Sequence, residues 1–259
     1  MVKALLTTSI PFAAVMGVAA SAGPASLWAG PKPQGPLKPF VIDMQGNPVG
    51  RTGADGPPTI FHDTMERVRW HGHEALRRVA ATTDPGGTEF TRWADLIFDE
   101  KTLLPYRSEW RRADGSFVRH EFDGVHVKET RKTAGAAPEI TAAFDLPEPA
   151  FAWIEGVGLP ILLALPLREG FEGSVPVISG DPSSIVPCTQ APCFAARMSY
   201  RVVGQETITG ISNKPTPTWK VWVPGSAFTF WIATADPRLE GVNWPRPGGM
   251  FSMGPVVKR

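Results

Sequence analysis

Two histidines separated by one glycine are the residues whose spacing best suits metal chemistry. His71 and His73 flank Gly72, and on a strand both imidazoles would point to the same face, as two ligands of a transition metal must. The alternative is a hairpin turn at the glycine, between Trp70 and Glu74, where polar residues are expected in any case. A third ligand would have to come from elsewhere in the fold. We assign no metal and no cofactor from the sequence, and metal binding by the pair stays open.

Other residue types that carry out catalysis lack the pattern that it needs. No serine lies in a Gly-x-Ser-x-Gly motif. The carboxylates of Asp95, Asp99 and Glu100 suit the exposed face and the turn of a strand. We therefore predict no catalytic residues and a protein that is not an enzyme, with a metal-dependent hydrolase using His71 and His73 as a lesser alternative.

The first 22 residues have the features of an export signal. Lys3 supplies a positive start, Ala4 to Val18 is an uncharged apolar run, and Ala20-Ser21-Ala22 is a small-residue cleavage site. We expect cleavage near Ala22 and a periplasmic product. No later stretch is long enough to cross a membrane as a helix, so the mature chain is expected to have no transmembrane segment.

The expected export also bears on the state of the two cysteines. Cys188 and Cys193 are separated by Thr-Gln-Ala-Pro in a chain expected to be exported. In an oxidising compartment this spacing predicts a disulfide that closes a small loop between strands.

The charge balance excludes some partners. Removal of Lys3 with the signal leaves 25 basic and 25 acidic residues, and a neutral chain has no electrostatic reason to bind nucleic acid. The chain also has nine Trp and 14 Phe but only two Tyr. Such large apolar rings indicate either ordinary core packing or an apolar cavity.

The chain divides into three parts. Residues 1–22 are the signal, and residues 23–57 are a Pro- and Gly-rich arm that we expect to be mostly irregular. Residues 58–259 are expected to form a single domain.

Alternation of apolar and polar residues dominates the domain, and this period of two predicts antiparallel strands with one buried face. The strands are expected at 59–70, 74–82, 89–99, 104–112, 116–122, 125–131, 172–178, 194–203, 205–211, 217–223 and 227–233.

One apolar segment, residues 146–167, breaks this alternation. Phe151, Ile154 and Val157 lie at helical spacing after Pro149, and two short helices are predicted. With few polar residues, the segment needs a cover, and the apolar face of the sheet is the natural one. The expected fold class is α+β, mainly β.

Three short segments can be compared with known families. Leu96–Tyr106 has a strand, a Thr-Leu-x-Pro turn and a new strand, Leu163–Gly170 follows the expected helices, and Val221-Trp222 with Phe230-Trp231-Ile232 forms a closing hairpin. Over residues 58–245 this pattern resembles uncharacterised exported bacterial proteins related to the periplasmic lipoprotein carriers. The resemblance implies a curved antiparallel half-barrel sheet whose concave face is plugged by short helices, with acyl chains or other lipids held between them.

The function expected from this combination is the binding or carrying of a lipid or other hydrophobic ligand in the cell envelope. Residues 146–167 would be the plug. An envelope scaffold whose closed core leaves an edge strand free for a protein partner is the alternative. The residues expected to line the cavity are Phe151, Trp153, Ile154, Leu159, Ile161 and Leu162 of the plug, and Met198, Tyr200, Trp219, Val221, Phe228 and Phe230 of the sheet.

Overall fold

The computed structural model describes residues 37–49, 59–83, 90–136, 138–153, 159–179, 196–224, 228–246 and 249–256, and this part of the chain is mainly β-structure. The N-terminal strands are β1 (Phe40–Val49), β2 (Thr59–Trp70), β3 (His73–Thr83), β4 (Phe90–Asp99), β5 (Pro105–Arg111), β6 (Phe117–Asp123), β7 (His126–Lys132) and β8 (Ile140–Asp145). The C-terminal strands are β9 (Phe151–Trp153), β10 (Glu172–Ser179), β11 (Ala196–Thr209), β12 (Pro215–Val223), β13 (Phe228–Ala233), β14 (Leu239–Arg246) and β15 (Gly249–Pro255). One helix, α1 (Leu159–Ala164), lies between β9 and β10.

All 15 strands belong to one sheet, in the order β8-β7-β6-β5-β4-β3-β2-β1-β15-β14-β13-β12-β11-β10-β9. Neighbours pair antiparallel, except that β9 and β10 pair parallel. The N-terminal and C-terminal strands meet where β1 pairs with β15. The sheet is not closed, because its edge strands β8 and β9 pair only with β7 and β10 and not with each other.

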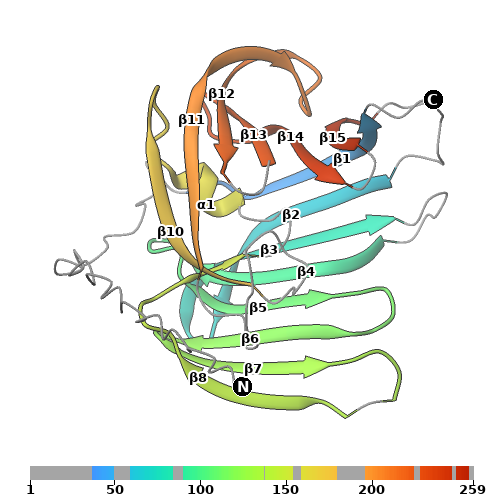
Figure 1. Ribbon diagram of the computed structural model, residues 1–259, viewed down its shortest axis with the longest axis vertical. Helices are drawn as coiled ribbons and strands as arrows, with labels where there is room; N and C mark the ends of the chain where they lie inside the picture. The colour runs from blue at the N-terminus through green and yellow to red at the C-terminus, as the bar shows by residue number, and fades with distance from the viewer. Residues whose placement is uncertain are drawn as a thin grey trace, which may run out of the picture.

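The sheet folds over itself, so that its two parts share one core. In Figure 1 the strands β10 and β11 run across the front of β2 to β5, with α1 between the two layers. The main cluster of buried residues joins Phe61, Leu76 and Phe98 of the N-terminal strands to Val175 and Phe230 of the C-terminal strands. Hydrophobic burial therefore holds together segments that are far apart in the sequence.

Most of the strands predicted from the alternating pattern are confirmed. The prediction of two strands at 194–203 and 205–211 is wrong, because β11 runs unbroken across this region with a register shift between Val202 and Gly204. The sequence reading also missed β8, β14 and β15. In β8 the exposed residues give no alternating pattern to detect, and Pro245 and three glycines interrupt the pattern of β14 and β15.

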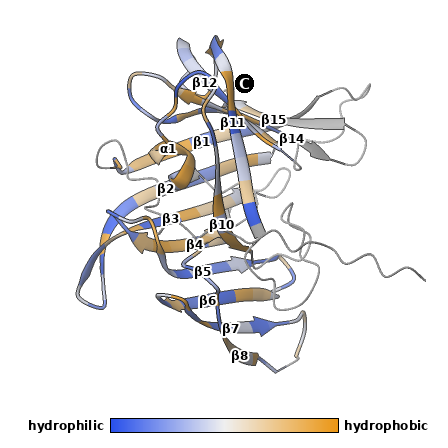
Figure 2. Ribbon diagram, turned by 60° about the vertical axis from the view of Figure 1, so that its left-hand side comes forward, coloured by the Kyte–Doolittle hydropathy of each residue, from blue (hydrophilic) through white to orange (hydrophobic). Residues whose placement is uncertain are grey.

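The helical pair predicted over 146–167 is largely wrong. Phe151–Trp153 is the short strand β9, and the helix is only the six residues Leu159–Ala164. Pro160 fits the first turn of this helix, where a backbone N–H has no partner to lose. The helix is hydrophobic throughout, as its colour in Figure 2 shows, and Ile161 to Ala164 are buried in the main core. One short helix of six residues thus replaces the expected pair of helices.

The arm expected to be mostly irregular over 23–57 contains the strand β1, Phe40–Val49. It pairs with both β2 and β15 and thereby occupies the middle of the sheet. Its sequence was misread because Gly46 and Pro48 are residues that strands disfavour. The expected export signal, residues 1–22, lies outside the described residues.

Among the described residues, the search for a helix with the length and hydrophobicity to cross a membrane finds none.

Candidate functional site

A pocket of about 290 Å³ lies where the N-terminal strands face the C-terminal ones. It is partly open to solvent, and more of its wall is apolar than polar. The apolar residues that the N-terminal strands contribute are Met44, Phe61, Ala80, Trp93 and Trp110. Those from the C-terminal strands are Phe228, Leu239, Val242 and Met253. We call this space the inner pocket.

Small side chains and a bulge create the inner pocket. Ala80 of β3 pairs directly with Ala94 of β4, and both are buried beside Trp93 and Trp110. The register shifts between Ala80 and Ala81, so Trp93 is the extra residue on β4. Such a bulge redirects a side chain that a regular strand would place on the other face. The small side chains of Ala80 and Ala94, against which Trp93 and Trp110 pack, thus leave room that larger side chains would fill.

The inner pocket has one ion pair in its wall. Arg78 of β3 donates from Nε to Oδ1 of Asp63 on β2 over 2.9 Å, and a second bond joins Nη2 to Oδ2. The side chain of Arg78 is 3% exposed and that of Asp63 is 2% exposed. Because a buried charge is tolerated only when it is paired, the two residues neutralise each other and present no net charge to the pocket.

One hydrogen-bond donor of the pocket wall has no acceptor. The indole Nε1 of Trp93 is buried and without a partner among the described residues. Most buried N–H groups in folded proteins have a partner, either in the protein or in bound water. Among the described residues, this indole N–H is the buried side-chain polar atom that lacks a hydrogen-bond partner.

Two arginines border the pocket at the end of β5. The guanidinium carbon of Arg112 lies 4.7 Å from the ring centroid of Trp110, and that of Arg111 lies 4.8 Å from that of Phe117. Arg111 also donates to Glu109 over 2.7 Å. Burial raises the pKa of the Glu109 carboxyl, but hydrogen bonds from Arg111 and Arg119 outweigh it and lower the pKa. These interactions hold the two arginine side chains against the protein surface beside the pocket.

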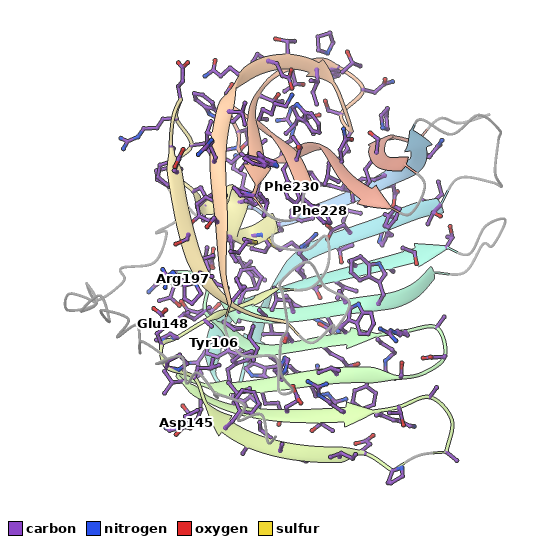
Figure 3. All side chains as sticks on the ribbon, in the orientation of Figure 1. Tyr106, Asp145, Glu148, Arg197, Phe228 and Phe230 are labelled. Atoms are coloured by element: carbon purple, nitrogen blue, oxygen red, sulfur yellow. The ribbon has the colours of Figure 1, made fainter. Side chains whose placement is uncertain are left out.

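The residues expected to line a ligand cavity belong mostly to the packed core beside the inner pocket. Phe228 alone of them also lines the pocket, and Figure 3 shows it next to Phe230 on the C-terminal strands. Trp219 is partly buried against the same core. The side chains of Trp153, Ile154 and Leu159 lie outside the described set. The expected residues that are fully buried in the core are Phe151, Ile161, Leu162, Met198, Tyr200, Val221, Phe228 and Phe230.

Tyr200 illustrates how tightly this core is packed. Burial raises the pKa of its phenol to about 12. It pairs across strands with Gly173, where an added Cβ would lie 2.8 Å from the tyrosine ring. The glycine makes room for the ring, which a larger residue at this position would displace.

The His71-Gly72-His73 triplet forms a hairpin turn. Trp70 pairs with His73, and both His71 (φ 45°) and Gly72 (φ 88°) have positive φ, as a tight two-residue turn between twisted strands requires. His73 stacks on Tyr106 with 5.6 Å between ring centroids. No group of three or more potential metal ligands occurs in the part of the chain that the structure describes.

Sequence reasoning missed a buried polar network on the inner face of the sheet. Ser108, His120 and Glu129 are directly opposite one another on β5, β6 and β7. Ser108 Oγ lies 3.4 Å from His120 Nδ1, and His120 Nε2 lies 2.8 Å from Glu129 Oε2. Arg131 donates to the same carboxylate from Nη2 over 3.0 Å. Polar residues at inward positions of predicted strands were the signal that could have revealed it.

Ser, His and Glu are also the residue types of a hydrolase triad, but the residues around these three support a structural role. Ser108 lies inside β5, which is paired on both sides, so the neighbouring N–H groups belong to the sheet ladder and cannot bind an oxyanion. The three side chains are buried, and β9 contacts β5. Burial raises the pKa of Glu129, but hydrogen bonds from His120 and Arg131 outweigh it and bring the pKa to about 2.

The basic residues of the neighbouring strands form ion pairs with glutamates on the same face. On the outer face, Arg107 and Arg119 both contact Glu109 over 2.8 Å, and Lys128 lies 3.4 Å from Glu121. Two of these pairs run across strands and one lies within β5, and together they account for this charge without a charged ligand.

Cys188 and Cys193 lie outside the described residues, so the disulfide stays a prediction.

Comparison with known proteins finds no family model that matches the chain, and no curated protein or solved structure that is significantly similar to it. The resemblance to the lipoprotein-carrier relatives therefore depends on the short sequence segments alone.

Proposed function

We propose that this protein is a non-enzymatic binding protein of the cell envelope that holds a hydrophobic small molecule in the inner pocket. The observation that carries the proposal is the pocket between the two parts of the sheet, with its apolar wall and its self-neutralised ion pair. Apolar walls with few polar groups are typical of small-molecule sites. The proposal includes export of the protein through the signal at residues 1–22. It also includes a half-barrel fold like that of the lipoprotein carriers.

The size of the pocket limits the ligand. Its volume of about 290 Å³ is roughly twice that of an engineered 150 Å³ cavity that binds benzene. A molecule of two or three aromatic rings or one medium-length chain fits this space. A lipid with two long acyl chains does not fit within it, so the proposed ligand is smaller than the cargo of a lipoprotein carrier.

Filling the pocket tests the proposal. Ala80→Leu adds three carbons at the pocket wall, and Thr82→Leu, at the next inward position of β3, replaces a hydroxyl with a larger branched apolar group. The probe is N-phenyl-1-naphthylamine, a neutral dye whose fluorescence rises in apolar sites. We expect the wild-type protein to bind it and each filled variant to bind at least about tenfold more weakly, since about 1.4 kcal/mol of lost contact suffices for that.

The matched control is Ala142→Leu, the same change at an exposed position of β8. It should leave dye binding unchanged, with circular dichroism confirming that all three variants are folded. Absence of dye binding by the wild-type protein, or equal binding by the folded variants with a filled pocket, would refute the proposal.

A second candidate function is an envelope scaffold that recruits a protein through β8. This strand is the last in the sheet order, and Ile140 at its start is 67% exposed. An edge strand offers unpaired N–H and C=O groups to an extended segment of another protein. Ala142→Pro would remove one donor from this strand. Capture of one stoichiometric protein by the wild type but not by the variant would favour the scaffold.

A further inference from the structure

The lining of the inner pocket carries more positive than negative side chains. Among the described residues that line it, three are arginines, Arg78, Arg111 and Arg112, and one is a carboxylate, Asp63. Asp63 is bonded to Arg78 in the buried wall, so the charges of Arg111 and Arg112 remain at the end of β5. A surface with this excess of positive charge is complementary to an anionic group on a ligand.

The arginines around the end of β5 share few carboxylates. Glu109 accepts from Arg111 over 2.7 Å and from both Arg107 and Arg119 over 2.8 Å. Three cations therefore surround one anion. Asp95 lies 4.0 Å from Arg107 but is itself bonded over 2.7 Å by an arginine of β3. The ion pairs of this region thus leave a local excess of positive charge beside the pocket.

Arg112 is the arginine placed to meet a ligand. It lines the pocket and is exposed, so it marks the open side of the pocket. Its guanidinium carbon lies 4.7 Å from the centroid of the Trp110 ring, which is itself part of the lining. A guanidinium has five N–H donors in a planar fork that fits a carboxylate. Arg112 can therefore bind a carboxylate in addition to the contacts that it already makes.

We propose that the ligand is an amphiphilic monocarboxylate, whose apolar body fills the inner pocket and whose carboxylate lies at the open side against Arg112. This inference rests on the proposed function and adds the chemical class of the ligand. Because the pocket is partly open to solvent, the carboxylate keeps water on one side and avoids the full cost of burying a charge. A neutral molecule of the same shape gains only the apolar contact.

The experiment compares two probes of nearly equal shape, 2-naphthoate and 2-acetylnaphthalene. Only the first carries a charge at neutral pH. Their dissociation constants are measured by displacement of N-phenyl-1-naphthylamine from the full mature chain and from its Arg112→Gln variant. Dividing the wild-type preference for the carboxylate by that of the variant cancels the different solubilities of the probes, as in a double-mutant cycle. We expect a ratio of at least about threefold, the equivalent of about 0.7 kcal/mol, which is within the range of partly exposed ion pairs.

Arg201→Gln is the matched control. Arg201 also lies over a tryptophan ring, with its guanidinium carbon 6.0 Å from the centroid of Trp222, but it does not line the inner pocket. Its loss removes the same charge from the protein and should keep the wild-type preference.

The salt dependence of the unsubstituted protein covers the case in which Arg112→Gln does not fold. Raising the NaCl concentration from about 0.05 M to about 0.5 M shortens the screening length. The wild-type preference for 2-naphthoate over the ketone should then fall by about twofold or more.

The outcomes separate this inference from the proposed function. An equal preference in wild type and folded Arg112→Gln, or a wild-type preference that salt does not change, would overturn the carboxylate claim and leave the binding function standing. An equal loss of preference in Arg201→Gln would also overturn it, because net charge and not Arg112 would then attract the anion. No binding of any probe would refute the proposed function itself.

Discussion

At the scale of single residues, the inner face of the sheet combines apolar packing with paired charges. Asp63 bonds Arg78 at the inner pocket, and Glu129 bonds His120 and Arg131 further along the sheet. A buried pair adds little stability compared with apolar residues, but a buried charge left alone costs several kcal/mol. These pairs are therefore requirements of the fold.

The Glu129 carboxylate should make stability depend on pH. Its pKa is about 2 in the folded protein, against an ordinary value of 4.5. Because the folded pKa is the lower one, its contribution is complete above about pH 4.5 and is lost as the pH falls towards 2. We expect the free energy of unfolding of wild type to fall more steeply between pH 5 and pH 3 than that of Glu129→Gln, as measured by urea titration at each pH.

Glu121→Gln is the control for this measurement. Glu121 is on β6 and its side chain is 48% exposed, with Lys128 at 3.4 Å as its partner. Exposed pairs contribute little to stability, so this variant should follow the wild-type curve. If Glu129→Gln also followed it, the network would not hold the carboxylate as described.

At the scale of elements, close approach of two chain segments positions the C-terminal strands. The N–H of Ile211 donates to the carbonyl of Glu240 over 2.7 Å. The fully buried Glu240 carboxylate accepts from the N–H of Ser212 over 3.0 Å and from Arg238 Nε over 2.8 Å. The turn after β11 is thereby bound to the start of β14.

Gly210 is the residue that permits this approach. A Cβ at this position would lie 1.9 Å from the carbonyl oxygen of Glu240, so Gly210→Ala must push the two backbones apart. We expect a loss of about 1–3 kcal/mol or more in the free energy of unfolding. Gly254→Ala, where nothing lies within 4 Å of the added atom, should stay within about 0.5 kcal/mol of wild type. Chemical denaturation compares the two, and equal losses would contradict the close approach.

At the scale of the whole molecule, the N-terminal and C-terminal strands share one sheet and one core, so we expect them to unfold cooperatively. Pairing of β1 with β15 joins them through the sheet, and the main core joins them across its inner face. Arg197 of β11 also donates to Glu148 over 2.6 Å, and Figure 3 shows the two side chains side by side at the entry to β9. The inner pocket exists only because the two groups of strands face each other.

Met44 tests this cooperativity because it lies on β1 and is 4% exposed in the shared core. Met44→Ala should cost about 2–5 kcal/mol and should weaken both groups of strands together. Amide hydrogen exchange followed by mass spectrometry should show faster exchange in β3 and in β12 alike. Val41→Ala, on the same strand at a position 71% exposed, should change neither. Faster exchange on one side alone would indicate two independent units.

The alternating pattern in the sequence was sufficient to predict a mainly β protein and most of its long strands. Period-two burial is a local property, since one face of each strand packs and the other meets water. Turn residues such as Gly72 marked where strands end. The same local reasoning failed for β1, whose Pro and Gly disfavour a strand, and for Phe151–Trp153, whose neighbourhood has helical spacing. Both segments are strands because they pair with segments that are distant in the sequence.

Only the tertiary structure decided which residues could form a site. No local pattern links Ala80 and Trp93 to Phe228 and Val242, because the pocket forms from two parts of the sheet brought together by folding. The same holds for the unused N–H of Trp93, since the absence of an acceptor depends on every neighbour in space. The sequence alone determined strands and charge balance, which follow from nearby residues, while cavities and unsatisfied donors follow from packing.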